Sequence, residues 1–198
     1  MIKIENSREF QNIVDNLKDG KFSEALEKTK QISKIYSNEN IVSKLFASIY
    51  FNLGQWENSI KYFKKTLLFE KEKFKTYTNL GVALFKLGKI NDSINAFKDS
   101  IKENKNFFLA HNNIGISYLE IGKLDEAINH FVISLKLNHN DRNAKSNIIN
   151  IFNIKKPKNI SHPLIELNNK IRNIRYDKEI DSIFTDQKIK IILEKANK

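Results

Sequence analysis

LEIGKLDEAINHF, residues 119–131, is the stretch that decides the fold, because three earlier segments of the chain repeat its pattern. The matching segments are FKLGKINDSINAF at 85–97, NLGQWENSIKYF at 52–63 and KDGKFSEALEKT at 18–29. The alignment places a glycine every 34 residues, at Gly20, Gly54, Gly88 and Gly122. A fixed internal period of this length indicates a chain built from repeated structural units.

Each unit is predicted to be two helices joined by a tight turn at its glycine. Before Gly88, Leu80 and Leu84 share one helical face. After it, Ile94 and Phe97 share a face of the next helix. Glycine suits the turn because it adopts a positive φ without steric cost. One such helix pair cannot bury its apolar face alone, so neighbouring pairs must stack.

The repeat resembles the tetratricopeptide repeat, whose 34-residue pattern is W-x2-L-G-x2-Y, then A-x3-F, then P. The unit from residue 74 reads Tyr77-x2-Leu80-Gly81-x2-Leu84, followed by Ser93-x3-Phe97. The unit from residue 108 keeps the pattern with histidine in the aromatic position, whereas the first unit is degenerate. The terminal proline is absent from every unit.

The resemblance covers residues 6–154 and implies an all-α fold, a right-handed α-solenoid of antiparallel helix pairs. The predicted solenoid domain is residues 1–154, with repeats at about residues 6–39, 40–73, 74–107 and 108–141 and a capping helix at 142–154. Small residues recur where helices are expected to cross closely, at Ala47, Gly81, Gly115, Ala25, Ser59, Ser93 and Ala127. We expect them to serve packing.

Residues 155–198 are predicted to be a basic, short helical tail, because KKPKNISHPL breaks the repeat pattern at two prolines. The tail carries 11 basic and 6 acidic residues. It either folds back on the repeats, binds a partner or begins a further domain.

Composition narrows the class of protein. The 198 residues are 40% apolar and 29% charged, with no apolar run long enough to span a membrane. The start MIKIENSREFQ does not read as a signal peptide. The absence of cysteine fits an intracellular protein, and we expect it in the cytoplasm. The net charge is +11, but lysines are scattered among acids, so we do not expect a nucleic acid partner.

No catalytic constellation is evident in the sequence, so we expect no enzymatic activity, cofactor or metal. Phosphate-binding loops and serine-nucleophile motifs are missing. The four histidines lack the spacing of metal ligands. His111 replaces the usual aromatic of a first helix and is expected to pack there.

The most informative polar residues are Asn79, Asn113 and Asn147, which are 34 residues apart. In the family, first helices line the inner, concave surface. A carboxamide both donates and accepts hydrogen bonds, so a ladder of asparagines can hold a peptide backbone without reading its side chains. Asparagine is common throughout this chain, which is the competing explanation for the ladder.

Other predicted partner-binding residues on the same faces are Lys44, Lys75, Phe85, Asn112, Ile116 and Leu119. Their mixture of charge and apolar surface does not reproduce the basic clamp that grips acidic chaperone tails. Lys44 and Asn79 match two positions of that clamp, whereas Leu109 and Asn113 replace its basic residues.

The predicted function is a protein–protein interaction scaffold that binds an extended peptide or a helix in a concave groove. The alternative is the repeat region of a larger enzyme, of transferase or oxygenase type, whose catalytic domain lies outside this chain.

Overall fold

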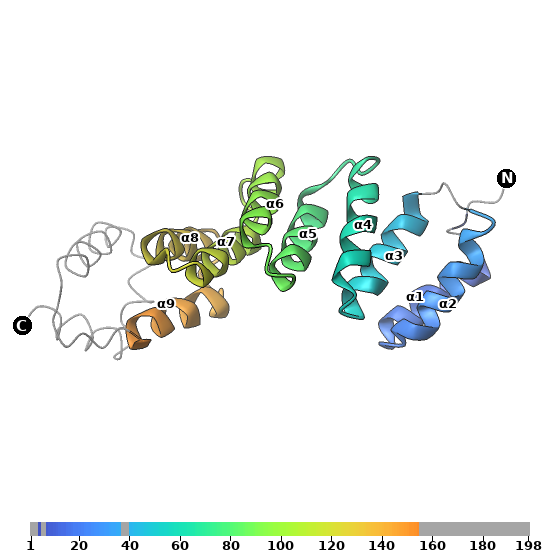
Figure 1. Ribbon diagram of the computed structural model, residues 1–198, viewed down its shortest axis with the longest axis horizontal. Coiled ribbons are helices and arrows are strands. Elements are labelled where there is room, and N and C mark those ends of the chain that lie inside the picture. Colours follow the sequence, from blue (N-terminus) through green and yellow to red (C-terminus); the bar gives the residue numbers. More distant parts are fainter. Residues whose placement is uncertain (1–3, 5–6, 37–39, 155–198) are drawn as a thin grey trace, which may run out of the picture. The chain divides into compact units, whose positions relative to one another are not determined.

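The computed structural model describes Ile4 and residues 7–36 and 40–154 (Figure 1). The predicted tail, residues 155–198, lies outside the described residues. The described part of the chain contains no strand and has the following helices: α1 (Arg8–Lys18), α2 (Phe22–Ser33), α3 (Asn40–Asn52), α4 (Trp56–Leu67), α5 (Phe74–Lys86), α6 (Ile90–Glu103), α7 (Phe108–Glu120), α8 (Leu124–Leu137) and α9 (Arg142–Ile154). The predicted all-α class is confirmed.

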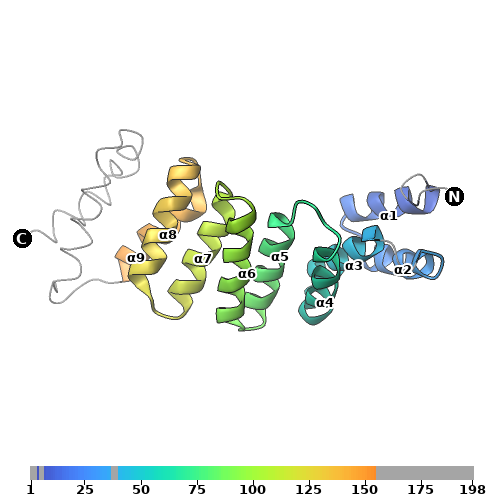
Figure 2. The ribbon, with the colours of Figure 1, turned by 90° about the horizontal axis from the view of Figure 1, so that it is seen from above.

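The helices fall into two compact units, with α1–α6 in residues 1–105 and α7–α9 in the remainder. In the first unit each helix packs against its neighbours in the chain, from α1 through α6. In the second, α7 packs on α8, and α9 packs on both of them. Figure 2 shows the pairing of successive helices from above. A single solenoid over residues 1–154 stays a prediction.

The glycine turns have the predicted geometry. The φ angles at Gly20, Gly54, Gly88 and Gly122 are 73°, 70°, 73° and 74°. At Gly88 the glycine N–H donates to the Phe85 carbonyl (2.9 Å), and the next N–H donates to the Leu84 carbonyl (3.0 Å). This pair of bonds is a Schellman motif, which satisfies carbonyls at the end of the first helix. It reverses the chain and sets two helices side by side.

Small residues let the two helices of a pair approach closely. A Cβ added to Gly81 would lie 2.5 Å from the Phe97 ring, and one added to Gly115 would lie 2.6 Å from the Phe131 ring. Both rings are almost fully buried. Phenylalanine on the second helix therefore occupies the space that glycine leaves open on the first.

Buried hydroxyl groups fasten the two ends of a repeat together. The Ser100 hydroxyl donates to the Phe74 carbonyl (2.7 Å), and Thr78 donates to Ser100 (2.8 Å). In the second unit, the Ser134 hydroxyl lies 3.0 Å from the Phe108 carbonyl and 2.7 Å from a carboxylate oxygen of Asp141. These bonds fix the beginning of each first helix against the last turns of its partner.

Asp141 also starts the final helix. Its Oδ1 accepts the backbone N–H groups of Asn143 (3.1 Å) and Ala144 (3.3 Å), as an N-cap residue does. The predicted capping helix at 142–154 coincides with α9. Its apolar face, which includes Ala144, Ile148 and Ile151, is buried.

Candidate protein-binding faces

The three ladder asparagines lie on first helices, as the repeat pattern predicts. Asn79 is exposed on α5 in the first unit, and Asn113 and Asn147 are half-buried on α7 and α9 in the second. Each directly precedes a buried apolar residue of its helix, such as Ile114 or Ile148. The asparagine is therefore turned by about a third of a helical turn from the core.

The ladder carboxamides are largely unengaged within the described residues. The side chains of Asn79 and Asn113 have no hydrogen-bond partner there. Asn147 donates through Nδ2 to Oδ1 of Asn112, at the long distance of 3.4 Å. Two whole carboxamides and part of a third therefore remain available to an incoming chain.

Asn112 is placed differently from the other predicted binding residues. It is only 4% exposed, and its oxygen accepts the hydrogen bond from Asn147. Asn112 is therefore turned away from solvent and contacts the Asn147 carboxamide instead of presenting its own surface.

The two predicted cations are not equivalent. The amine of Lys44 on α3 forms an ion pair with Glu70 at 2.7 Å, and the same carboxylate accepts a hydrogen bond from Thr76. Lys75 is exposed at the start of α5, with its amine 5.6 Å from the centre of the Phe74 ring. Much of the charge of Lys44 is therefore already compensated within the first unit.

The predicted apolar contacts are all half-buried: Phe85 near the end of α5, and Ile116 and Leu119 on α7. Part of each side chain packs inside its own unit. The remainder faces solvent. Ile116 follows Asn113 by three residues on α7, so these two side chains lie on neighbouring turns of one helix face.

A histidine pair joins α7 to α8. His111 is buried, as predicted, and its Nδ1 lies 3.2 Å from Nδ1 of His130. The bond requires the proton on Nδ1 of one ring only. The Tyr118 ring lies beside His130, with 5.6 Å between the ring centres. Nothing in the sequence indicated this pairing, because it depends on how two helices face each other.

Burial lowers the pKa of His111 below its ordinary value of 6.5, because the charged imidazolium loses hydration. The unfolded chain therefore binds more protons than the folded chain at mildly acidic pH. We expect the free energy of unfolding to fall as the pH drops from about 6.5 through the lowered pKa. Replacement by phenylalanine, His111→Phe, should weaken this dependence.

The measurement is urea unfolding from about pH 7.5 to about pH 5. His139→Asn is the control, because His139 is exposed in the turn before α9. If His111→Phe kept the pH dependence of the wild type, the contribution of His111 would be disproved.

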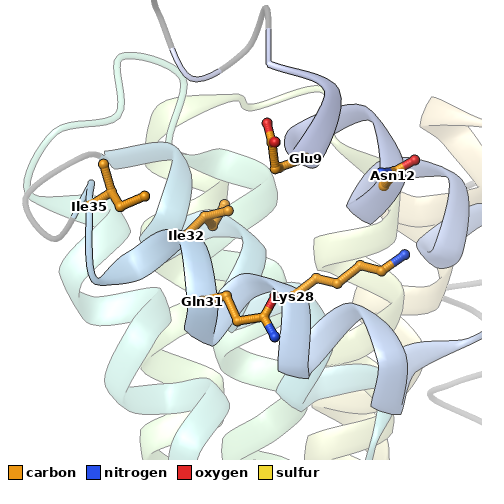
Figure 3. A pocket seen from close by; sticks show the side chains of 6 residues that line it. All are labelled: Glu9, Asn12, Lys28, Gln31, Ile32 and Ile35. Carbon is orange, nitrogen blue, oxygen red and sulfur yellow. The ribbon is translucent and has the colours of Figure 1, made fainter.

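A separate pocket lies between α1 and α2, with a volume of about 240 Å³ (Figure 3). Glu9 and Asn12 of α1 face Lys28, Gln31 and Ile32 of α2 and Ile35, which lies just beyond the end of α2. None of these residues was predicted to bind a partner. Ile35 is 77% exposed.

The described residues lack two further kinds of feature. No group of three or more His, Asp or Glu side chains is placed to hold a metal ion. No described helix is long and apolar enough to cross a membrane.

The tetratricopeptide repeat family model matches residues 45–70 and 74–107 of this chain. These two segments contain α4, α5 and α6 and most of α3. No curated protein matches the sequence.

Solved structures with a similar fold include a crystal structure of MamA, which is 18% identical with a TM-score of 0.65. The match covers 100% of this chain and 98% of that one. MamA from Desulfovibrio magneticus RS-1 is 14% identical with a TM-score of 0.64, over 68% of this chain and 76% of that one. A chain of the APC/C hetero-tetramer Cut9–Hcn1 is 22% identical with a TM-score of 0.63. The match covers 68% of this chain and 27% of that one. At these identities the likeness concerns the fold alone.

Proposed function

Because this chain contains tetratricopeptide repeats, a fold of protein-interaction scaffolds, we propose that it grips an extended peptide or a helix of a partner protein. Each unit contributes its own contact surface: the solvent-facing side of α5 in the first unit, and those of α7 and α9 in the second. Asn79, Asn113 and Asn147 supply hydrogen bonds to the partner's backbone. Phe85, Ile116 and Leu119 supply apolar contact.

The observation that carries this proposal is the unengaged state of the ladder carboxamides. Within the described residues, Asn79 and Asn113 have side chains without hydrogen-bond partners, although Asn113 is half-buried. A carboxamide offers two donors and an acceptor, which match the carbonyl and N–H of a peptide unit. A partner's backbone can satisfy these groups whatever its side chains are, so the face tolerates several sequences.

One structure of similar fold supports an interaction role. It comes from the Cut9–Hcn1 hetero-tetramer of the APC/C, so that protein assembles with a different one. In our proposal, the second unit of this chain likewise binds a different protein. Asn113 and Asn147 hold the backbone, and Asn112 fixes the orientation of Asn147 through the 3.4 Å hydrogen bond.

We expect Asn113→Ala to weaken binding of a captured partner by about 1–3 kcal/mol, because the partner loses a hydrogen bond and keeps an unpaired polar group. The stability of the repeat protein should stay nearly unchanged. Isothermal titration with the partner gives the affinity, and urea unfolding gives the stability.

Asn129→Ala is the matched control, because Asn129 is exposed on α8, a second helix. Equal affinity of the Asn113 variant and the wild type would contradict the proposal. A similar loss in the Asn129 variant would place the contact on the second helices instead.

A further inference from the structure

The end of α4 presents two neighbouring apolar side chains to solvent. Leu68 is 75% exposed and Phe69 is 62% exposed, although both are large and apolar. They stand where the chain leaves α4 on its way to α5 (Figure 1). Residues 64–72, called the α4 tip below, contain both of them.

Positive charge predominates around these two side chains. Lys64 and Lys65 are exposed in the last turn of α4, and Lys71 is exposed just beyond Phe69. The tip also contains two acids: Glu70 is paired with Lys44 of α3 at 2.7 Å, and Glu72 is exposed. The tip therefore combines two exposed apolar side chains with three exposed lysines and one exposed acid.

Helix electrostatics explains only part of this arrangement. Lysines in a last turn complement the negative end of the helix, which accounts for Lys64 and Lys65. The Lys65 amine also lies 5.4 Å from the centre of the Tyr62 ring. Helical phase turns Leu68 away from the buried face of α4, since it follows the buried Ser59 by about two and a half turns. None of these effects gives a reason for the exposed side chains there to be large and apolar, or for Lys71 to follow them.

We propose that the α4 tip docks on the surface of a lipid bilayer that carries anionic headgroups. Leu68 and Phe69 enter the boundary between headgroups and acyl chains, and the lysines lie among the phosphates. Reversible attachment to a membrane surface generally combines an apolar and an electrostatic contribution, and the tip supplies both. This goes beyond the proposed function, because the ladder asparagines play no part in it.

The size of the tip favours a bilayer over a protein. A stable protein interface buries about 800 Å² on each partner, far more than two side chains provide. A bilayer needs no complementary pocket, and its charge is spread over many headgroups. Its attraction for the lysines requires no fixed partner geometry.

The test is co-sedimentation of the full chain with phosphatidylcholine vesicles, prepared with and without phosphatidylglycerol. We expect the wild type to sediment only with the anionic vesicles, and less so as salt is raised. Leu68→Ser/Phe69→Ser should reduce the partition coefficient at least about ten-fold, since two buried apolar side chains are lost. Lys64→Gln/Lys71→Gln should reduce it about five-fold for each lysine.

Matched controls separate the tip from the general basic charge of the chain. Ile121→Ser removes an apolar side chain that is 40% exposed at the end of α7. Lys98→Gln/Lys136→Gln removes two exposed lysines from α6 and α8. Both variants should sediment like the wild type. Unchanged melting temperatures would show that all variants are folded.

Two results would overturn the proposal. One is a wild type that stays in the supernatant with anionic vesicles. The other is undiminished sedimentation of Leu68→Ser/Phe69→Ser, because charge alone would then hold the protein to the vesicles.

Discussion

Gly115→Val is expected to lower the free energy of unfolding by about 2 kcal/mol or more, through overpacking where α7 crosses α8. A Cβ at this position would lie 2.6 Å from the Phe131 ring, which is fully buried. Real Cβ atoms essentially never come so close to another heavy atom. The ring is enclosed, so the helices themselves must separate. Urea unfolding, followed by helical circular dichroism, measures the loss.

A double-mutant cycle ties this loss to the predicted contact. Phe131→Leu replaces the ring with a smaller side chain and leaves room beside residue 115. Gly115→Val should therefore cost less in the Phe131→Leu background than in the wild type. Equal costs in both backgrounds would mean that the valine destabilises the chain for a different reason.

Asp141→Ala is expected to lower the free energy of unfolding by about 2 kcal/mol, because one carboxylate serves two purposes. Its Oδ1 caps α9 by accepting from Asn143 and Ala144, and its Oδ2 lies 2.7 Å from the Ser134 hydroxyl. A lost N-cap costs about 1 kcal/mol, and a buried polar group left without this partner costs a similar amount. Thermal and urea unfolding of the variant would show the loss.

Asp141→Asn is the conservative control. Asparagine is an equally good N-cap, and its amide can donate to Ser134 while the hydroxyl donates to the Phe108 carbonyl. Its cost should be small. Asp125→Ala removes an exposed acid from the first turn of α8 and should also have little effect. If Asp141→Ala were as mild as these two, the cap and network at the start of α9 would not contribute to stability.

The secondary structure followed closely from the sequence because the repeat determines it. The predicted repeat starts at residues 40, 74 and 108 are the first residues of α3, α5 and α7, and the predicted capping helix coincides with α9. Glycine at a positive φ is a local requirement, so its 34-residue spacing located every turn between the two helices of a pair. Small residues opposite phenylalanine likewise indicated where helices cross.

The repeat pattern of the sequence does not predict which side chains pair with one another. Lys44 and Glu70 are 26 residues apart, and their ion pair depends on the path of the segment between α4 and α5. The burial of Asn112 could not be predicted either. It and Asn113 are neighbours on one helix, and only the packed structure decides which of them faces solvent. The pairing of His111 with His130 has the same origin.

The exposure of Leu68 at the tip of α4 follows from helical phase. Leu68 comes about two and a half turns after the buried Ser59, so it lies on the opposite side of the helix. The spacing of apolar residues therefore predicts burial better than their apolar character alone.

The most direct test of the central claim, that the first-helix asparagines hold a partner, is a pull-down from native lysate with the wild type and two variants. One variant carries Asn79→Ala, Asn113→Ala and Asn147→Ala. The other carries Asn95→Ala and Asn129→Ala, exposed asparagines of the second helices α6 and α8. We predict that mass spectrometry will find proteins held by the wild type and the second variant but lost from the first. Retention of the same proteins by all three would contradict a binding role for the ladder.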